Sequence, residues 1–142
     1  SMSFQVQVTG AEPFSIEPEC TKHVKFSTDI PMDSDARTKD VGATLVISGK
    51  ILANATGAAA DSTRQMLLWS VVPAERAEAY RNVTVTYVAG GVVERKYTFT
   101  NAFVVDYQEV YDDGDGNGTF TLWLKQKKDK MAELQVEGGY SA

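Results

Sequence analysis

Residues 82–111, NVTVTYVAGGVVERKYTFTNAFVVDYQEVY, hold the clearest signal for the fold. Apolar and polar residues alternate on both sides of Gly90-Gly91, which is the pattern of β-strands that each bury one face. Two consecutive glycines supply the positive backbone angles that a two-residue hairpin turn requires. The stretch therefore predicts a tight antiparallel hairpin over 83–100, followed by another strand at 103–108.

The same alternation recurs along most of the chain. The segments that show it are 4–8, 23–27, 44–52, 83–87, 92–100, 103–108, 119–125 and 133–137. The exception begins at Ser62, which forms a capping-box pattern with Gln65 and is followed by helix formers on both sides of Pro73. We predict a mainly β, single-domain barrel or sandwich over residues 1–142, with about eight strands and one or two short helices at about residues 62–80.

Two other segments lack strand alternation. Residues 29–43 form a long charged loop, and residues 53–60, ANATGAAA, read as a small-residue linker. Long loops inside a compact domain are usually functional or mobile. We therefore expect the charged loop to contribute to function.

Composition excludes several classes of protein. The 142 residues carry 14 Lys and Arg against 19 Asp and Glu, a net charge of −5, which argues against specific nucleic-acid binding. One cysteine, Cys20, and one histidine, His23, exclude an internal disulfide, cysteine-based zinc sites and sites that need two histidines. No apolar run reaches the ~20 residues needed to span a bilayer, and the first residues lack the pattern of a signal peptide. We expect no enzyme activity, no cofactor and no membrane insertion.

The sharpest local motif lies at residues 113–119, DGDGNGT. Side-chain oxygens of Asp113, Asp115 and Asn117, with the carbonyl of Thr119, match the first half of a calcium loop. The twelfth position, where such a loop has a bidentate Glu, is Leu124, and the flanking residues alternate like strands. A plain hairpin loop of turn-forming residues also accounts for the motif. We expect no metal here, with calcium as the alternative.

The same hairpin predicts a strand register. If its turn is centred near Asp115, Asp106 lies opposite Lys125. Opposite charges at directly facing positions stabilise a strand pair by a few tenths of a kcal/mol and help to fix its register. We therefore predict a cross-strand ion pair between these two residues.

An ordered series of segments resembles a known family. In chain order they are ATLVISGKI (43–51), STRQMLLWSVVPAERAEAY (62–80), NVTVTYV (82–88), YTFTNAFVVDYQEVY (97–111) and GTFTLWLKQKK (118–128). Together they resemble the tube-forming proteins of contractile machines, which are the hemolysin-coregulated proteins (Hcp) of type VI secretion and the tail-tube proteins of contractile phages. The resemblance covers about two-thirds of the chain. The DDGDGNG loop and the Gly-Ala segment depart from the secretion-type proteins and favour a phage-tail-like or extracellular injection particle.

This resemblance implies a structural subunit that assembles into stacked, hexameric rings. It also implies assembly in the bacterial cytoplasm, followed by secretion or incorporation into an extracellular particle, with sheath, baseplate or spike proteins and secreted effectors as partners. In the family, a long loop near residues 29–43 reaches the next ring. The charged residues that would make this ring-stacking contact are Asp33, Asp35, Arg37, Lys39 and Asp40.

Strand edges agree with self-assembly. The prolines lie at positions 13, 18, 31 and 73, so every expected strand after Thr44 lacks proline. Exposed edges of this kind pair readily with neighbouring chains. Two other functions stay open: a small-ligand or carbohydrate-binding β module that uses calcium at 113–119, and a hydrolase that works from carboxylates alone.

Overall fold

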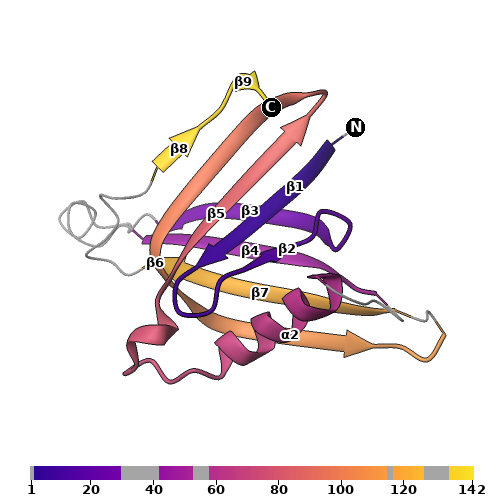
Figure 1. Cartoon of the computed structure of the whole chain (residues 1–142), viewed down its shortest axis with the longest axis vertical. Helices are drawn as coiled ribbons and strands as arrows, with labels where there is room; N and C mark the ends of the chain where they lie inside the picture. The colour runs from indigo at the N-terminus through magenta and orange to yellow at the C-terminus, as the bar shows by residue number, and fades with distance from the viewer. Residues whose placement is uncertain (1, 30–41, 53–57, 115–116, 127–134) are drawn as a thin grey trace.

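The described part of the chain contains nine strands in one antiparallel sheet, with two helical segments beside it (Figure 1). The computed structural model describes residues 2–29, 42–52, 58–114, 117–126 and 135–142. The strands are β1 (Met2–Thr9), β2 (Phe14–Ile16), β3 (Thr21–Asp29), β4 (Gly42–Ile51), β5 (Arg81–Ala89), β6 (Val92–Tyr111), β7 (Gly118–Gln126), β8 (Gln135–Glu137) and β9 (Tyr140–Ser141). The helical segments are α2 (Ala58–Ser70) and the 3-10 helix η1 (Ala77–Ala79). The predicted fold class, mainly β with short helices, is confirmed.

The long strand β6 joins the two halves of the sheet. The strand order is β2-β1-β5-β6-β7-β4-β3, and β8 and β9 also pair with β6. The first half of β6 pairs with β5 and its second half pairs with β7. Figure 1 shows β6 bending between the group that contains β1 and β5 and the group that contains β3, β4 and β7. The two groups enclose the core between them.

The hairpin between β5 and β6 has the predicted turn. Ala89 lies opposite Val92, so the turn consists of Gly90 and Gly91 alone. Both glycines have positive φ values, 58° and 78°, which residues other than glycine rarely adopt. The prediction of a tight two-residue hairpin is confirmed.

The predicted strands 92–100 and 103–108 are one continuous strand of 20 residues. Between them, Asn101 has a φ of 55° and its N–H bonds to the side-chain oxygen of Asn82 at 3.2 Å. The register with β5 shifts at the same place. Asparagine tolerates this left-handed conformation better than most residues, so the strand bends there without ending.

The expected number of about eight strands is close to the nine observed, but the assignments differ at both ends. β2 and β9 were not predicted, because three and two residues are too short to show alternation. The last predicted strand, 133–137, is described only at 135–137, as β8.

The helical region begins earlier than predicted. α2 starts at Ala58, so residues 58–60 belong to the helix and not to the predicted linker over 53–60. Three consecutive alanines, the best helix formers, explain the earlier start; residues 53–57 lie outside the described residues. After Pro73 the chain forms only the short η1. Neither of the described helices is long and apolar enough to cross a bilayer.

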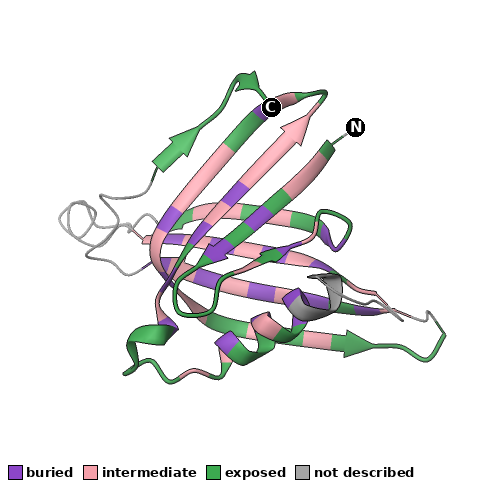
Figure 2. Cartoon of the chain, in the orientation of Figure 1, coloured by how far each residue is buried: buried purple, intermediate pink, exposed green. Residues whose placement is uncertain are grey.

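One apolar cluster forms the core, and the strands that build it alternate as predicted. In β4 and β7 every second side chain is buried, and Figure 2 shows the buried residues recurring along these strands. Met66 and Trp69 of α2 join the same cluster, because α2 packs against β2 and β6. The largest fully buried side chains are Trp69, Phe99, Phe120, Ile16, Leu45, Ile47, Met66, Leu122 and Leu124.

Candidate assembly interface

The two ends of the strand order are the first candidates for contact between copies. β2 covers only Val6–Val8 of β1, and it is an edge strand of three residues. At the other end, β3 pairs with β4 on one side and carries the exposed residues Lys22 and Lys25. Short edge strands and lysines are devices by which proteins discourage indiscriminate edge pairing. These two edges are therefore partly protected.

An aromatic groove of about 260 Å³ opens between β1 and β3, which contact each other although they lie near opposite ends of the strand order. Phe4 stacks on Tyr87 with ring centroids 5.2 Å apart, and Phe26 stacks on Tyr97 at 4.6 Å. The lining residues are Met2, Phe4, Val24, Phe26, Val85, Tyr87, Arg95 and Tyr97. Such a groove accepts apolar side chains.

The last turn of α2 and the residue that follows it expose large apolar side chains. Met66 and Trp69 face the core, whereas Leu67, Leu68 and Val71 are 44%, 56% and 67% exposed. We call these three residues the helix patch. Exposed apolar residues that cluster in this way mark surfaces that bind other proteins.

A buried arginine and tryptophan hold α2 in place. The indole N–H of Trp69 donates to the Ala79 carbonyl at 2.9 Å, and the Arg81 guanidinium lies 5.2 Å from the indole ring centroid. Arg81 also donates to the carbonyls of Glu78 and Glu12, at 3.1 and 3.4 Å. Burial lowers the pKa of Arg81, and the nearby charge of Glu12 opposes that shift. These contacts tie α2 to η1 and to the turn after β1, and so they position the helix patch.

A carboxylate near the end of β6 binds two tyrosines. Glu109 accepts hydrogen bonds from the hydroxyls of Tyr107, at 2.7 Å, and Tyr111, at 2.8 Å. Burial raises the pKa of Tyr107 well above its ordinary value of 10.0, and the hydrogen bond to Glu109 raises it further. The hydrogen bond to the same carboxylate is the main cause that raises the pKa of Tyr111. Both shifts favour the neutral phenol in the folded protein.

These shifts predict a loss of stability at alkaline pH. Because the pKa of Tyr107 is higher in the folded than in the unfolded chain, its contribution is complete below about pH 10 and is lost as the pH rises above that value. We expect Tyr107→Phe to lower the free energy of unfolding by about 1–2 kcal/mol at pH 7 and to flatten its decline above pH 10. Urea unfolding from pH 7 to 11 tests this, with Tyr140→Phe as the exposed control; parallel curves for Tyr107→Phe and the wild type would contradict it.

The predicted ion pair between Asp106 and Lys125 rests on a wrong register. Asp106 lies opposite Trp123, and Lys125 lies opposite Phe103. Tyr111 lies opposite Gly118, so the hairpin is centred one residue earlier than predicted and the partner of Asp106 moves by two residues. A further shift between Val104 and Asp106 affects only the partners beyond it, such as Phe103 and Lys125. The Asp106 carboxylate instead accepts a hydrogen bond from the N–H of Tyr107, at 2.9 Å.

The predicted calcium motif is only partly described. Asp113 and Thr119 are exposed and Asn117 is half-buried, whereas Asp115 lies outside the described residues. In the described ranges, no three His, Cys, Asp or Glu side chains lie close enough to hold a metal ion. Calcium binding at this loop stays a prediction, which calorimetric titration with calcium tests.

The predicted ring-stacking residues are not described either. Asp33, Asp35, Arg37, Lys39 and Asp40 all fall within residues 30–41, which lie outside the described residues. Their role in stacking stays a prediction.

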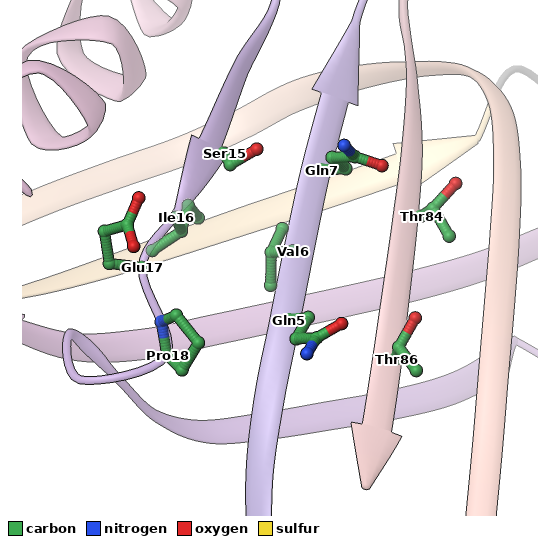
Figure 3. Close-up of a pocket in the computed structure, with 9 residues that line it drawn as sticks. All are labelled: Gln5, Val6, Gln7, Ser15, Ile16, Glu17, Pro18, Thr84 and Thr86. Atoms are coloured by element: carbon green, nitrogen blue, oxygen red, sulfur yellow. The ribbon is translucent and has the colours of Figure 1, made fainter. Parts of the chain in front are cut away.

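A polar depression of about 290 Å³ lies beside the paired strands β2, β1 and β5 (Figure 3). The register places Gln7 beside both Ser15 and Thr84, and Gln5 beside Thr86. Glu17 is the one ionisable residue in its lining. Neutral amides and hydroxyls of this kind can hydrogen-bond to a polar surface without strong attraction to either charge.

The sequence matches no family model and no curated protein. Its fold is nevertheless found in solved structures of contractile machines. A chain in the anti-feeding prophage baseplate superposes with a TM-score of 0.55 at 17% identity, covering 97% of this chain and 94% of that one. A chain of the sheath-tube complex of the extracellular contractile injection system PVC gives 0.51 at 11% identity, covering 96% and 88%.

Hcp1 from Flavobacterium johnsoniae gives a TM-score of 0.51 at 13% identity, covering 97% of this chain and 99% of that one. At identities this low, the likeness establishes the fold and not the activity. The similarity extends over nearly the whole chain and confirms, at the level of the fold, the resemblance seen in the sequence. The chain has the same fold as Hcp1 and as these chains of two contractile assemblies.

Proposed function

We propose that this protein is a structural subunit that assembles into rings, which stack into the tube of a contractile injection system. The observation that carries the proposal is the shared fold, which extends over 94% of the anti-feeding prophage chain and 99% of Hcp1. A match along the whole length includes the strands and the helix that a ring subunit would place against its neighbours. The proposal covers type VI secretion and phage-tail-like particles alike.

The surface supports self-association. The helix patch exposes three large apolar side chains at the end of α2, which is held in place by Trp69 and Arg81. In a head-to-tail assembly, one surface of each copy binds a different surface of the next copy. Such contacts close into a ring when the rotation between neighbouring copies adds up to a full turn. We propose that the helix patch is buried in the assembled particle.

The finer features of the proposal follow the resemblance. They are a ring of six copies, ring stacking through residues 29–43, and contacts with sheath, baseplate or spike proteins. Assembly would take place in the bacterial cytoplasm, before the particle acts or is released.

Light scattering after size-exclusion chromatography, together with negative-stain microscopy, tests the proposal. We expect annuli or filaments, and a mass in solution that is a multiple of the subunit mass. A monomer at the highest soluble concentration, with no annuli on the grid, would overturn it.

A charged helix patch is expected to abolish this assembly. Leu68→Glu with Val71→Glu places two carboxylates in a contact that the proposal requires to be apolar, so assembly should fall by at least tenfold while the fold is unchanged. Thr9→Glu with Thr119→Glu adds the same charge at exposed positions of β1 and β7, away from the ends of the strand order, and serves as the control. Circular dichroism checks the fold of both, and equal assembly by the two double variants would remove the helix patch from the interface.

A further inference from the structure

Residues 135–142, which we call the arm, lie along one edge of β6 as an added strand. β8 pairs with Lys96–Thr98, and β9 pairs with Val92 and Val93. Both short strands share one register, because Glu137 lies opposite Lys96 and Tyr140 lies opposite Val93, three residues apart on each chain. Figure 1 shows the arm beside the first half of β6. The arm is thus one antiparallel strand with an interruption at Gly138 and Gly139.

The interruption fits a bulge in β6. Opposite β5, the register shifts so that Glu94 is an extra residue between Val93 and Arg95. Gly138 lies directly against the carbonyl of Glu94, and a Cβ atom at position 138 would collide with that oxygen. Gly139 has a φ of +80° and donates its N–H to the Val93 carbonyl at 2.7 Å. The arm is therefore shaped for this edge of β6 in particular.

The arm contributes little to the core of its own subunit. All eight of its residues are exposed, including Val136 at 53% and Tyr140 at 43% (Figure 2). Backbone hydrogen bonds hold it, such as that from the Ala142 N–H to the Gly91 carbonyl at 2.9 Å. Each bond of this kind stabilises by about 1 kcal/mol. An identical arm from another copy would make the same bonds.

We propose that in the assembled particle the arm of each copy pairs with β6 of the next copy, in the register that it has here on its own β6. This proposal rests on the proposed assembly into rings. The exchange replaces contacts by equal ones, so it costs little once the copies are adjacent. Eight residues separate Gln126 from Gln135, and a chain of that length spans at most roughly 30 Å. Head-to-tail exchange links each copy to the next and leaves every β6 edge paired.

A pair of cysteines distinguishes exchange from pairing within one subunit. Lys96→Cys and Glu137→Cys, combined with Cys20→Ala, place two thiols at directly opposite positions, which suit a disulfide. In exchanged rings, oxidation links successive copies, and a non-reducing gel shows a ladder of covalent oligomers. We expect this ladder, and we expect a mixture of the two single-cysteine proteins to form a linked dimer.

The outcomes separate this proposal from the one on which it rests. If oxidised rings yield only single subunits, each with its disulfide closed internally, the proposed exchange is overturned. The proposed tube function is not affected by that result. A protein that forms no rings would overturn both. The double variant is checked by microscopy before oxidation, so the two failures are distinguishable.

A glycine substitution gives a second, independent test. Gly138→Ala should weaken the pairing of the arm, because the added Cβ meets the Glu94 carbonyl. Pairing within one copy is weakened equally, so the concentration at half-assembly should hardly change. Exchange of subunits between labelled rings requires each arm to leave β6 of the next copy, and we expect it to become about tenfold faster, the equivalent of one or two lost hydrogen bonds. Gly114→Ala is the matched control, since no atom lies within 4 Å of the added Cβ there. An unchanged rate of subunit exchange between rings of Gly138→Ala would overturn the proposal.

Discussion

Trp69→Ala is expected to lower the free energy of unfolding by about 4 kcal/mol. The Trp69 side chain is fully buried, and its removal leaves a cavity between α2 and the sheet. Truncation of a buried tryptophan typically costs about 3–5 kcal/mol. The substitution also removes the donor to the Ala79 carbonyl and the ring over which Arg81 lies. A loss of this size is a large share of the stability of a small domain.

Two matched variants separate the cost of the cavity from the cost of the lost hydrogen bond. Trp69→Phe keeps most of the buried ring and removes the hydrogen bond, so it should cost about 1–2 kcal/mol. Trp123→Phe changes a half-buried tryptophan on β7 and should cost less than Trp69→Phe. Urea unfolding measures all three. Equal losses for Trp69→Ala and Trp69→Phe would show that the cavity is filled by rearrangement and would contradict the prediction.

Gly49→Ala is expected to destabilise the protein by at least about 3 kcal/mol. Gly49 is buried in β4, and a Cβ atom there would collide with the carbonyl oxygen of Cys20 and lie 2.8 Å from the carbonyl carbon. That carbonyl cannot simply move aside, because it accepts a hydrogen bond from the N–H of Lys50 at 2.8 Å. The Phe120 ring, 3.1 Å away, blocks movement toward the core. The backbone at Cys20, just before β3, must therefore shift.

Gly114→Ala again provides the control for the loss of glycine itself. At position 114 the added methyl group meets nothing within 4 Å, so we expect a change of less than 0.5 kcal/mol, as at most surface positions. Thermal unfolding of both variants checks the difference. If Gly49→Ala melts within a degree or two of the wild type, the close approach of Cys20 to Gly49 is not as rigid as the structure indicates.

Much of the fold could be predicted because its signals are local. Alternation in β4 and β7 is visible within nine or ten residues, and the pair Gly90-Gly91 predicts a two-residue turn without any other part of the chain. A turn glycine acts through its own backbone angles, and an alternating apolar residue acts through the face of the strand that it occupies. Such information needs no knowledge of the rest of the chain.

The candidate interface could be predicted only in part. The helix region was found, but the helix patch was not singled out, because Leu67 and Leu68 look as suited to the core as Met66 does. A strand was predicted at 133–137, but its place beside β6 and its continuation as β9 were not. Gly138 and Gly139 acquire meaning only opposite the bulge at Glu94, some 44 residues earlier. The wrong partner of Asp106 has a different origin, since a hairpin centred one residue earlier than predicted moves every cross-strand partner by two residues.

By itself, the sequence determined that this chain is a β protein with a short helical insertion, because alternation and turn residues act within a few neighbours. Only the tertiary structure decided where β6 bends, which apolar face of α2 stays outside the core, and which edge the arm occupies. Those features depend on residues far apart in the chain, whose distances and registers are set by packing.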